Sequence, residues 1–451
     1  MDKIARIKVI SRNPDEYQRE TKFDIHKATR NYKANADPFR HQIEYTRALN
    51  GAKLQRLLAK PFLAALDGHN EAVHLLEKHP SRLSTILSGA RDGQVKVWHL
   101  TTKRCLQTVQ AHNGPINGIS IDNENGQTYV TVGQDSQLKI WDLPELVEGE
   151  AAEPTHSIPL DSVPHSVSHI ANSTDFVTCG EGISVWKALR DSPVRTYDLG
   201  PNTIQNIRCN PIEDSVIAGC ASDRSIFLLD SRQKEPLTRV VLKLRSNSVA
   251  WNPMESYTFT AANEDYNLYT FDMRYLDSAR NVHQGHTAAV MDVDYAPSGQ
   301  EFVSGSYDRS IRIFNVEAWK SREVYHAPRM QMVLSVLYTL DNKYIVSGSD
   351  EMNIRLWKSN ASEKLGPLKH REKVALEYSS KLLETYQHHP EIKRIVKHRH
   401  VPKQIYSAAK EHSIIRESQK RKQDNLRKHT KKPMPYVPER KKPIVKQGID
   451  E

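Results

Sequence analysis

A repeat of about 43 residues runs through most of this 451-residue chain and constrains its fold more than any other feature. Seven short segments of alternating apolar residues end at equivalent positions, with successive separations of 43, 45, 43, 42, 43 and 43 residues. These positions are Trp98, Trp141, Trp186, Leu229, Phe271, Phe314 and Trp357. A WD repeat forms one four-stranded blade and is about 40 to 45 residues long. The spacing therefore predicts an all-β fold, a seven-bladed WD-repeat β-propeller.

An acidic residue six positions before most of these seven positions forms a second periodic column. Its members are Asp92, Asp135, Asp223, Asp265, Asp308 and, in the last unit, Glu351. In a blade this is the turn between the second and third strands, where a carboxylate accepts hydrogen bonds from turn N–H groups and from an upstream histidine. Two full sets are predicted to form buried polar networks: His69, Ser88, Asp92 and Trp98, and His112, Thr131, Asp135 and Trp141. Such networks stabilise a core only when every member has a partner.

Serine, histidine and aspartate together could also indicate a catalytic triad. Here the sets recur at the repeat period, whereas a nucleophile would occur once, so a structural role is favoured. Blade six has Phe314 in place of the tryptophan, which truncates its network, and blade three lacks the aspartate and has a shortened turn at residues 180–182.

Motifs for phosphate binding (GxxxxGK[ST]), dinucleotide binding (GxGxxG), zinc proteolysis (HExxH) and acyl transfer (GxSxG) do not occur in the sequence. The chain is therefore expected not to be an enzyme and to need no cofactor and no metal. A propeller hydrolase would require a metal or nucleophile in the central channel, and no sequence element supports one.

Ring closure is predicted to use chain from before the first repeat. Residues 60–66 have the pattern of a strand and would form the outer strand of the last blade, which removes an exposed sheet edge. The chain is therefore predicted to have three segments: a basic N-terminal extension (1–59), the propeller (60–360) and a basic, partly α-helical C-terminal region (361–451).

Charge is separated along the chain. Residues 1–60 hold 14 basic and 7 acidic side chains (+7), residues 61–357 hold 26 and 36 (−10), and residues 358–451 hold 24 and 11 (+13). An acidic ring with basic flanks suggests an anionic partner for the flanks.

The C-terminal region begins with an amphipathic helix. Val374, Tyr378, Leu382 and Tyr386 recur every four residues, so this helix should dock either on the propeller or on a partner. A second helical run extends to about Leu426, and the Pro-rich, charged sequence after about residue 430 is expected to be disordered.

Two groups of basic residues in this region are candidates for binding anions. The first is a block proposed to contact RNA or a partner, formed by Lys393, Arg394, Lys397, Arg399, His400 and Lys403. The second suits nuclear import or phosphate contact and is formed by Lys420, Arg421, Lys422, Arg427, Lys428, Lys431 and Lys432. A solvated charged face is the alternative for both. Contacts to phosphate would position the protein and would weaken steeply with salt.

The cellular compartment is predicted from what the sequence lacks. Its four cysteines have no metal-binding spacing and are expected to be free thiols. No signal peptide and no apolar run of membrane-spanning length is evident, so we expect a soluble, intracellular protein without a membrane partner.

Blades four and five each end in an Asp-x-Arg signature. Blade four carries Asp223 and the signature Asp230-x-Arg232, and blade five carries Asp265 and the signature Asp272-x-Arg274. The pattern resembles the box of WD-repeat substrate receptors of cullin-RING ubiquitin ligases, which would make Asp223, Arg232, Asp265 and Arg274 adaptor contacts. Each arginine could instead simply pair with a neighbouring carboxylate.

Stretches across nearly the whole chain, both flanks included, resemble the suppressor-of-fibrillarin (Sof-like) family of nucleolar WD-repeat proteins. They are residues 11–17, 30–32, 47–50, 60–69, 251–274, 322–326, 348–366 and 388–406. The resemblance implies a component of the small-subunit processome, which assembles on precursor ribosomal RNA with a box C/D small nucleolar ribonucleoprotein. It also implies that animal members act as cullin-RING substrate receptors.

The favoured hypothesis is thus a non-enzymatic processome scaffold, needed for precursor ribosomal RNA processing and small-subunit biogenesis in the nucleus and nucleolus. Its expected partners are processome proteins, the box C/D particle and precursor ribosomal RNA. The alternative, which could coexist, is a substrate receptor that binds a cullin-RING ligase adaptor.

Overall fold

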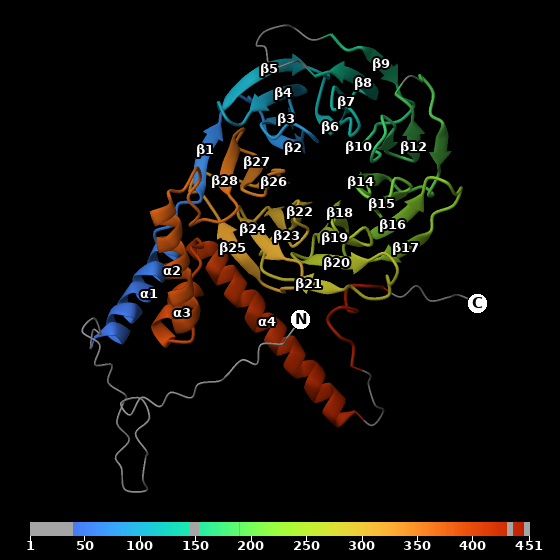
Figure 1. Cartoon of the computed structure of the whole chain (residues 1–451). Helices are drawn as coiled ribbons and strands as arrows, with labels where there is room; N and C mark the ends of the chain where they lie inside the picture. The colour runs from blue at the N-terminus through green and yellow to red at the C-terminus, as the bar shows by residue number, and fades with distance from the viewer. Residues whose placement is uncertain (1–38, 144–152, 189, 431–435, 446–451) are drawn as a thin grey trace, which may run out of the picture. The chain divides into compact units, whose positions relative to one another are not determined.

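The computed structural model describes residues 39–143, 153–188, 190–430 and 436–445. Within these residues, 28 strands form seven four-stranded antiparallel sheets that stand as blades around a ring (Figure 1). The seven-bladed WD-repeat propeller is confirmed. Each of the seven equivalent positions of the repeat lies in the third strand of its blade.

The strands follow one another from the inside of each blade to its outside. Blade one consists of β2 (Val73–Lys78), β3 (Thr85–Ala90), β4 (Gln94–His99) and β5 (Arg104–Gln110). Blade two consists of β6 (Ile116–Ile121), β7 (Thr128–Gly133), β8 (Gln137–Asp142) and β9 (His156–Pro159). Blade three consists of β10 (Ser166–His169), β11 (Phe176–Cys179), β12 (Ile183–Trp186) and β13 (Arg195–Tyr197). Blade four consists of β14 (Ile204–Cys209), β15 (Val216–Ala221), β16 (Ser225–Asp230) and β17 (Thr238–Val241).

The remaining three blades follow the same order. Blade five consists of β18 (Ser246–Trp251), β19 (Thr258–Asn263), β20 (Leu268–Asp272) and β21 (Asn281–His283). Blade six consists of β22 (Val290–Tyr295), β23 (Glu301–Ser306), β24 (Ile311–Asn315) and β25 (Ser321–Tyr325). Blade seven consists of β26 (Val333–Tyr338), β27 (Tyr344–Ser349), β28 (Ile354–Lys358) and, on its outside, β1 (Phe62–Leu66).

Blade seven closes the ring as predicted. β1 pairs antiparallel with β28, so that Phe62 lies opposite Trp357 and Leu66 lies opposite Ile354. The N-terminal chain thereby covers an edge that would otherwise offer unpaired backbone groups.

Apolar side chains between successive blades form the core. Each cluster joins two neighbours; Leu66, Trp98 and Val346, for example, pack together between blades seven and one. Full burial of one such side chain contributes roughly 1.5–3 kcal/mol. The core is therefore distributed around the ring, and every blade depends on the next.

Blade three is the irregular one, as the sequence indicated. Its strands are only three or four residues long. In its shortened turn the Gly180 N–H donates to the Gly182 carbonyl at 2.9 Å. A Cβ on Gly180 would meet the Val163 carbonyl oxygen at 2.7 Å, so this turn requires glycine.

The described residues also form four helices: α1 (Arg40–Arg56), α2 (His370–Tyr386), α3 (Pro390–Val396) and α4 (Lys403–His429). The chain divides into two compact units, and the division does not follow the three predicted segments. The first unit holds the described residues up to Leu54 together with residues 367–396, and the second holds the rest.

The first unit is a small helical cluster. Ala48 and Ala52 of α1 pack against Leu382 of α2 and Ile392 of α3. Small side chains on α1 let α2 approach closely, which is why the N-terminal and C-terminal segments combine. The amphipathic helix predicted around Leu382 therefore docks on α1, a possibility that the sequence did not suggest.

The apolar stripe predicted on α2 is buried towards its C-terminal end and exposed towards its N-terminal end. Leu382 is buried and Tyr386 is partly buried against α1, whereas Val374 and Tyr378 are 50% and 42% exposed. The Tyr378 hydroxyl accepts a hydrogen bond from Arg47 at 3.3 Å. Only the C-terminal half of the stripe thus belongs to the core of this unit.

In the second unit, residues 436–445 correct the prediction of disorder after about residue 430. The Lys243 N–H donates to the Pro443 carbonyl at 2.9 Å, and the Val445 N–H donates to the Val241 carbonyl at 2.8 Å. Ile444 packs against the core between blades four and five. The prolines and charges of this segment suggested disorder, although its apolar residue Ile444 packs into the core and its backbone pairs with the chain that follows β17.

Candidate functional site

The polar network of blade two is complete. His112 Nδ1 lies 2.9 Å from Asp135 Oδ1, and its Nε2 lies 2.8 Å from Thr131 Oγ1. The Trp141 indole donates to the same hydroxyl at 2.9 Å. Burial lowers the pKa of His112, which keeps the ring neutral inside the blade. The four residues brought together here link the turn between β7 and β8 to both of these strands and to the loop that precedes β6.

Blade six has an equally tight network without the tryptophan. His286 contacts Asp308 through Nδ1 at 2.9 Å and Ser304 through Nε2 at 2.7 Å. Asp308 also accepts from the Ser310 N–H at 2.9 Å and from its hydroxyl at 2.6 Å. Although burial alone would raise it, the pKa of Asp308 is lowered because His286 stabilises the carboxylate.

Blade one has the same residue types but a weaker network. His69 Nε2 lies 2.7 Å from Ser88 Oγ, to which the Trp98 indole donates at 2.8 Å. Among the described residues, His69 Nδ1 and Asp92 Oδ2 have no hydrogen-bond partner. Asp92 instead accepts only from the Gln94 N–H, at 3.0 Å. Of the predicted four residues, His69, Ser88 and Trp98 are therefore bonded to one another, whereas Asp92 is bonded only within its turn.

Charged side chains of the inner strands connect blades that are not neighbours. Arg208 of β14 contacts Glu77 of β2 at 3.3 Å, and Lys78 of β2 contacts Asp294 of β22 at 2.9 Å. Burial raises the pKa of Glu77. The channel carboxylates of these strands are thus engaged with cations. In the described part of the chain, no group of three or more His, Cys, Asp or Glu side chains could hold a metal ion.

The residues of the basic block proposed to contact RNA fall in both units. Lys393 and Arg394 lie on α3 of the first unit, and Lys397, His400 and Lys403 lie in the second. All five side chains are exposed. They are therefore available to an anionic partner.

Arg399, the sixth member of the block, differs from the other five. It is partly buried, and burial together with the nearby Arg56 guanidinium lowers its pKa, while Glu323 of β25 opposes that shift. Arg56 in turn contacts Glu323 at 2.7 Å. The sequence assigned Arg399 to RNA, whereas the structure places it among charged groups beside blade six.

The import candidates lie mainly on α4. Lys420, Arg421, Lys422 and Lys428 have exposed side chains. Arg427 is partly buried, contacts Asp424 at 3.2 Å and lies over the Tyr436 ring at 4.7 Å. Lys431 and Lys432 lie outside the described residues.

α4 is held to blade five by contacts that the sequence did not reveal. The Arg416 guanidinium donates to Gln284 at 2.6 Å and to Asn267 at 3.2 Å. The His412 and Tyr266 rings are 5.4 Å apart in an edge arrangement. These pairs are about 130–150 residues apart in the chain, so no local pattern could have indicated them.

The four adaptor candidates lie on two faces of the propeller. Asp223 precedes β16 and Arg232 follows it, just as Asp265 precedes β20 and Arg274 follows it. A strand of five or six residues spans roughly 17–20 Å. The two aspartates therefore lie on the face opposite the two arginines and do not form one site with them.

Arg232 and Arg274 occupy equivalent positions on neighbouring blades. Arg274 donates to Asp272 at 3.0 Å and 2.8 Å and lies over the Tyr257 ring at 4.0 Å. The Arg232 side chain is exposed, and its backbone N–H donates to Asp230 at 2.9 Å. Arg274 is thus held in a fixed orientation, whereas Arg232 is presented to solvent.

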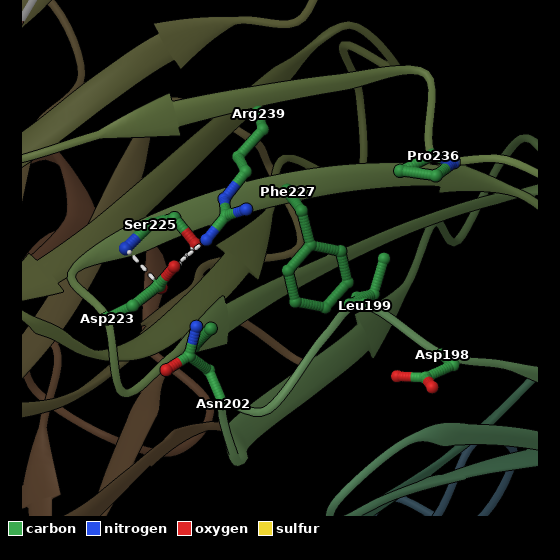
Figure 2. Close-up of a pocket in the computed structure, with 9 residues that line it drawn as sticks. Asp198, Leu199, Asn202, Asp223, Ser225, Phe227, Pro236 and Arg239 are labelled. Carbon is green, nitrogen blue, oxygen red and sulfur yellow. Dashed lines mark hydrogen bonds and ion pairs between the residues drawn. The ribbon is translucent and has the colours of Figure 1, made fainter. Parts of the chain in front are cut away.

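The aspartate of blade four lies beside a small pocket of about 200 Å³ (Figure 2). Asp223 accepts from the Ser225 N–H at 3.0 Å and forms an ion pair with Arg239. Leu199 and Phe227 provide apolar lining. The pocket is smaller than a typical site for a drug-sized ligand, about 300–1,000 Å³. Asp223 therefore acts in a structural pair whose arginine the sequence did not identify.

Comparison with known proteins covers both parts of the chain. A model of the Sof1-like domain matches residues 359–444. Models of the WD domain, G-beta repeat, match residues 60–99, 103–142, 278–315 and 319–358. The described fold and the family models thus agree on the position of the propeller.

Relatives match the chain over nearly its full length. The protein named DDB1- and CUL4-associated factor 13 in Homo sapiens is 51% identical over 442 residues, which is 98% of this chain and 99% of the relative. Proteins of the same name are 49% identical in Xenopus tropicalis (98% of this chain, 99% of the relative) and 42% identical in Dictyostelium discoideum (93% and 95%). The WD40 β-propeller domain of Doa1 superposes with a TM-score of 0.57 at 19% identity, covering 66% of this chain and 96% of that one, which shows the fold alone.

Proposed function

This chain belongs to the family of WD-repeat proteins with a Sof1-like domain, and we propose that it is a scaffold of the small-subunit processome. In this role it takes part in precursor ribosomal RNA processing and small-subunit biogenesis in the nucleolus. The propeller holds processome proteins and the box C/D particle, and the basic C-terminal region contacts precursor ribosomal RNA. Sequence stretches that resemble nucleolar Sof-like proteins, including residues 388–406, support this assignment.

The proposal that the C-terminal region contacts RNA rests on the difference in net charge between the ring and this region. The segment that forms the ring has a net charge of −10, whereas residues 358–451 carry +13. Lys397, His400 and Lys403, in the basic segment, are exposed. A polyanion would be repelled by the ring and attracted to this region, because backbone phosphates release counterions when cations neutralise them.

Reversing two of these charges should weaken RNA binding. We expect Lys397→Glu/Lys403→Glu to lower the affinity for a precursor small-subunit ribosomal RNA transcript by at least about tenfold at 0.15 M salt, because two phosphate contacts are lost. The matched control Lys187→Glu/Lys343→Glu makes the same charge change at exposed propeller lysines and should retain affinity within about threefold. Fluorescence anisotropy measures both. Equal losses in the two variants would contradict a specific role for the block.

A second role is proposed because the relatives are named as DDB1- and CUL4-associated factors. We propose that the chain also acts as a substrate receptor of a cullin-RING ligase. Arg232 and Arg274, on the same face of neighbouring blades, would contact the adaptor DDB1. The exposure of Arg232 and the fixed orientation of Arg274 favour this assignment over Asp223 and Asp265.

Charge reversal tests the adaptor role separately from RNA binding. The variant Arg232→Glu/Arg274→Glu should no longer retain DDB1 in a pull-down, since both positive groups are replaced by negative ones. Lys234→Glu, in the loop that follows β16, is the matched control and should retain it. Undiminished DDB1 recovery with the double variant would rule out these arginines as the contact.

A further inference from the structure

One face of α4 carries a line of four exposed cations, here called the α4 stripe: Lys403, Lys410, Arg421 and Lys428. They are 7, 11 and 7 residues apart, and these separations are close to whole numbers of helical turns. Ile405, the buried residue of α4, lies on the opposite side of the helix. His412 and Arg416, which contact blade five, lie on the same side as Ile405. The α4 stripe therefore faces away from the propeller.

The α4 stripe is long and straight. With a rise of about 1.5 Å per residue, its ends are about 37 Å apart and its cations are separated by about 10, 16 and 10 Å. Ile414 and Glu417 lie on the same face, so the stripe is cationic with one acidic interruption. The first turn of α4 holds no acidic residue, and no side chain caps it, which adds to the preference for an anionic partner at that end.

We propose that the α4 stripe binds the phosphate backbone of double-stranded RNA in its A-form. This inference rests on the proposed function and specifies the form of RNA that this surface takes. A rigid helix holds its cations at fixed separations, and a duplex holds its phosphates in fixed positions, so neither partner has to be ordered on binding. Double-stranded RNA is recognised mostly through shape and contacts to phosphate and 2′-hydroxyl groups.

Single-stranded RNA fits the same surface less well. Proteins that bind single strands stack successive bases on aromatic side chains. α4 contains one tyrosine, Tyr406, and no phenylalanine or tryptophan. One ring cannot form a stacking platform along 27 residues of helix.

The proposal reassigns two import candidates and leaves two others as controls. Arg421 and Lys428 belong to the α4 stripe, whereas Lys420 and Lys422 point to either side of it. The variants Arg421→Gln/Lys428→Gln and Lys420→Gln/Lys422→Gln both remove two charges from the same part of the helix. Glutamine has a helix propensity similar to that of lysine and arginine, so α4 should persist in both.

The test uses the full chain with two RNA probes of equal phosphate number. One is a perfectly paired duplex of about 18 base pairs, comparable in length to known duplex-binding footprints. The other is an unpaired oligouridine. Fluorescence anisotropy at several salt concentrations gives the affinity and its salt dependence. We expect the native protein to prefer the duplex and the stripe variant to lose affinity for it on the order of tenfold, with a salt slope lower by about 1.5.

The control variant should stay within about threefold of the native protein. Equal losses in the two variants, or tighter binding of oligouridine than of the duplex by the native protein, would overturn the α4 stripe as a duplex site. In those cases the protein still binds RNA, and the proposed function is unaffected. Failure of the native protein to bind either probe or the precursor transcript would overturn the proposed RNA contact itself.

Discussion

Replacing Asp308 with alanine is expected to lower the free energy of unfolding by about 3–5 kcal/mol, the range for breaking a buried charged network by removing one partner. The Asp308 side chain is 1% exposed and accepts hydrogen bonds from His286, Thr287 and Ser310. The buried Arg312 guanidinium lies close enough to lower its pKa. Alanine would leave these donors without an acceptor inside blade six.

Asp92→Ala is the matched control because Asp92 occupies the same position in blade one. Its carboxylate accepts one backbone hydrogen bond and is not bonded to His69. Its loss should therefore cost only about 0.5–1.5 kcal/mol, the net contribution of a single hydrogen bond. Urea unfolding of the two variants gives both values. Equal destabilisation would show that the repeat position, and not the completeness of the network, determines stability.

Acidification from pH 7 to pH 5 should destabilise the propeller strongly through three buried histidines. Burial lowers the pKa of His69 to about 4, of His169 to about 3 and of His283 to about 4. In the unfolded chain each titrates near its ordinary value of about 6.5. Below that pH the unfolded state binds protons that the folded state cannot, so the stabilising contribution present above pH 6.5 is lost as the pH falls.

The expected size follows from 1.36 kcal/mol for each pKa unit. Each histidine should contribute a loss of about 2 kcal/mol at pH 5, and the three together about 6 kcal/mol. His283→Gln removes one of them and should reduce the loss between pH 7 and pH 5 by about 2 kcal/mol, although it also weakens contacts to Thr270 and Ala318. Urea unfolding at pH 7, 6 and 5 provides the test. A free energy of unfolding that does not change between pH 7 and pH 5 would contradict the neutral burial of these rings.

The fold could be predicted because the residues that mark each blade recur at a regular spacing in the sequence. The equivalent positions from Trp98 to Trp357 recur at nearly constant spacing, and each lies in a third strand of the structure. Ring closure was predictable for the same reason, since residues 60–66 match a strand that blade seven lacks. The sequence could not show which polar networks are complete, because the contact between a carboxylate and its histidine depends on the local placement of the backbone. His69 and Asp92 illustrate this, since their types and spacing match those of blade two.

Contacts between distant segments could not be predicted from local pattern. The pairing of Ala48 with Leu382 depends on small residues on one helix meeting an apolar stripe more than 300 residues later. Ile444 is one apolar residue within a Pro-rich, charged sequence that suggested disorder, yet it packs into a core cluster. Arg399 was assigned to RNA from the charge of its neighbours, while Arg56 and Glu323, which surround it, lie elsewhere in the sequence.

Ultraviolet crosslinking in living cells tests whether this propeller protein contacts precursor ribosomal RNA through its basic C-terminal region. The protein is purified under denaturing conditions, the attached RNA is sequenced, and the crosslinked peptides are identified by mass spectrometry. We expect RNA from the precursor of the small ribosomal subunit, attached to peptides from residues 397–429. Recovery of no RNA above background, or crosslinks confined to the acidic propeller, would contradict this contact.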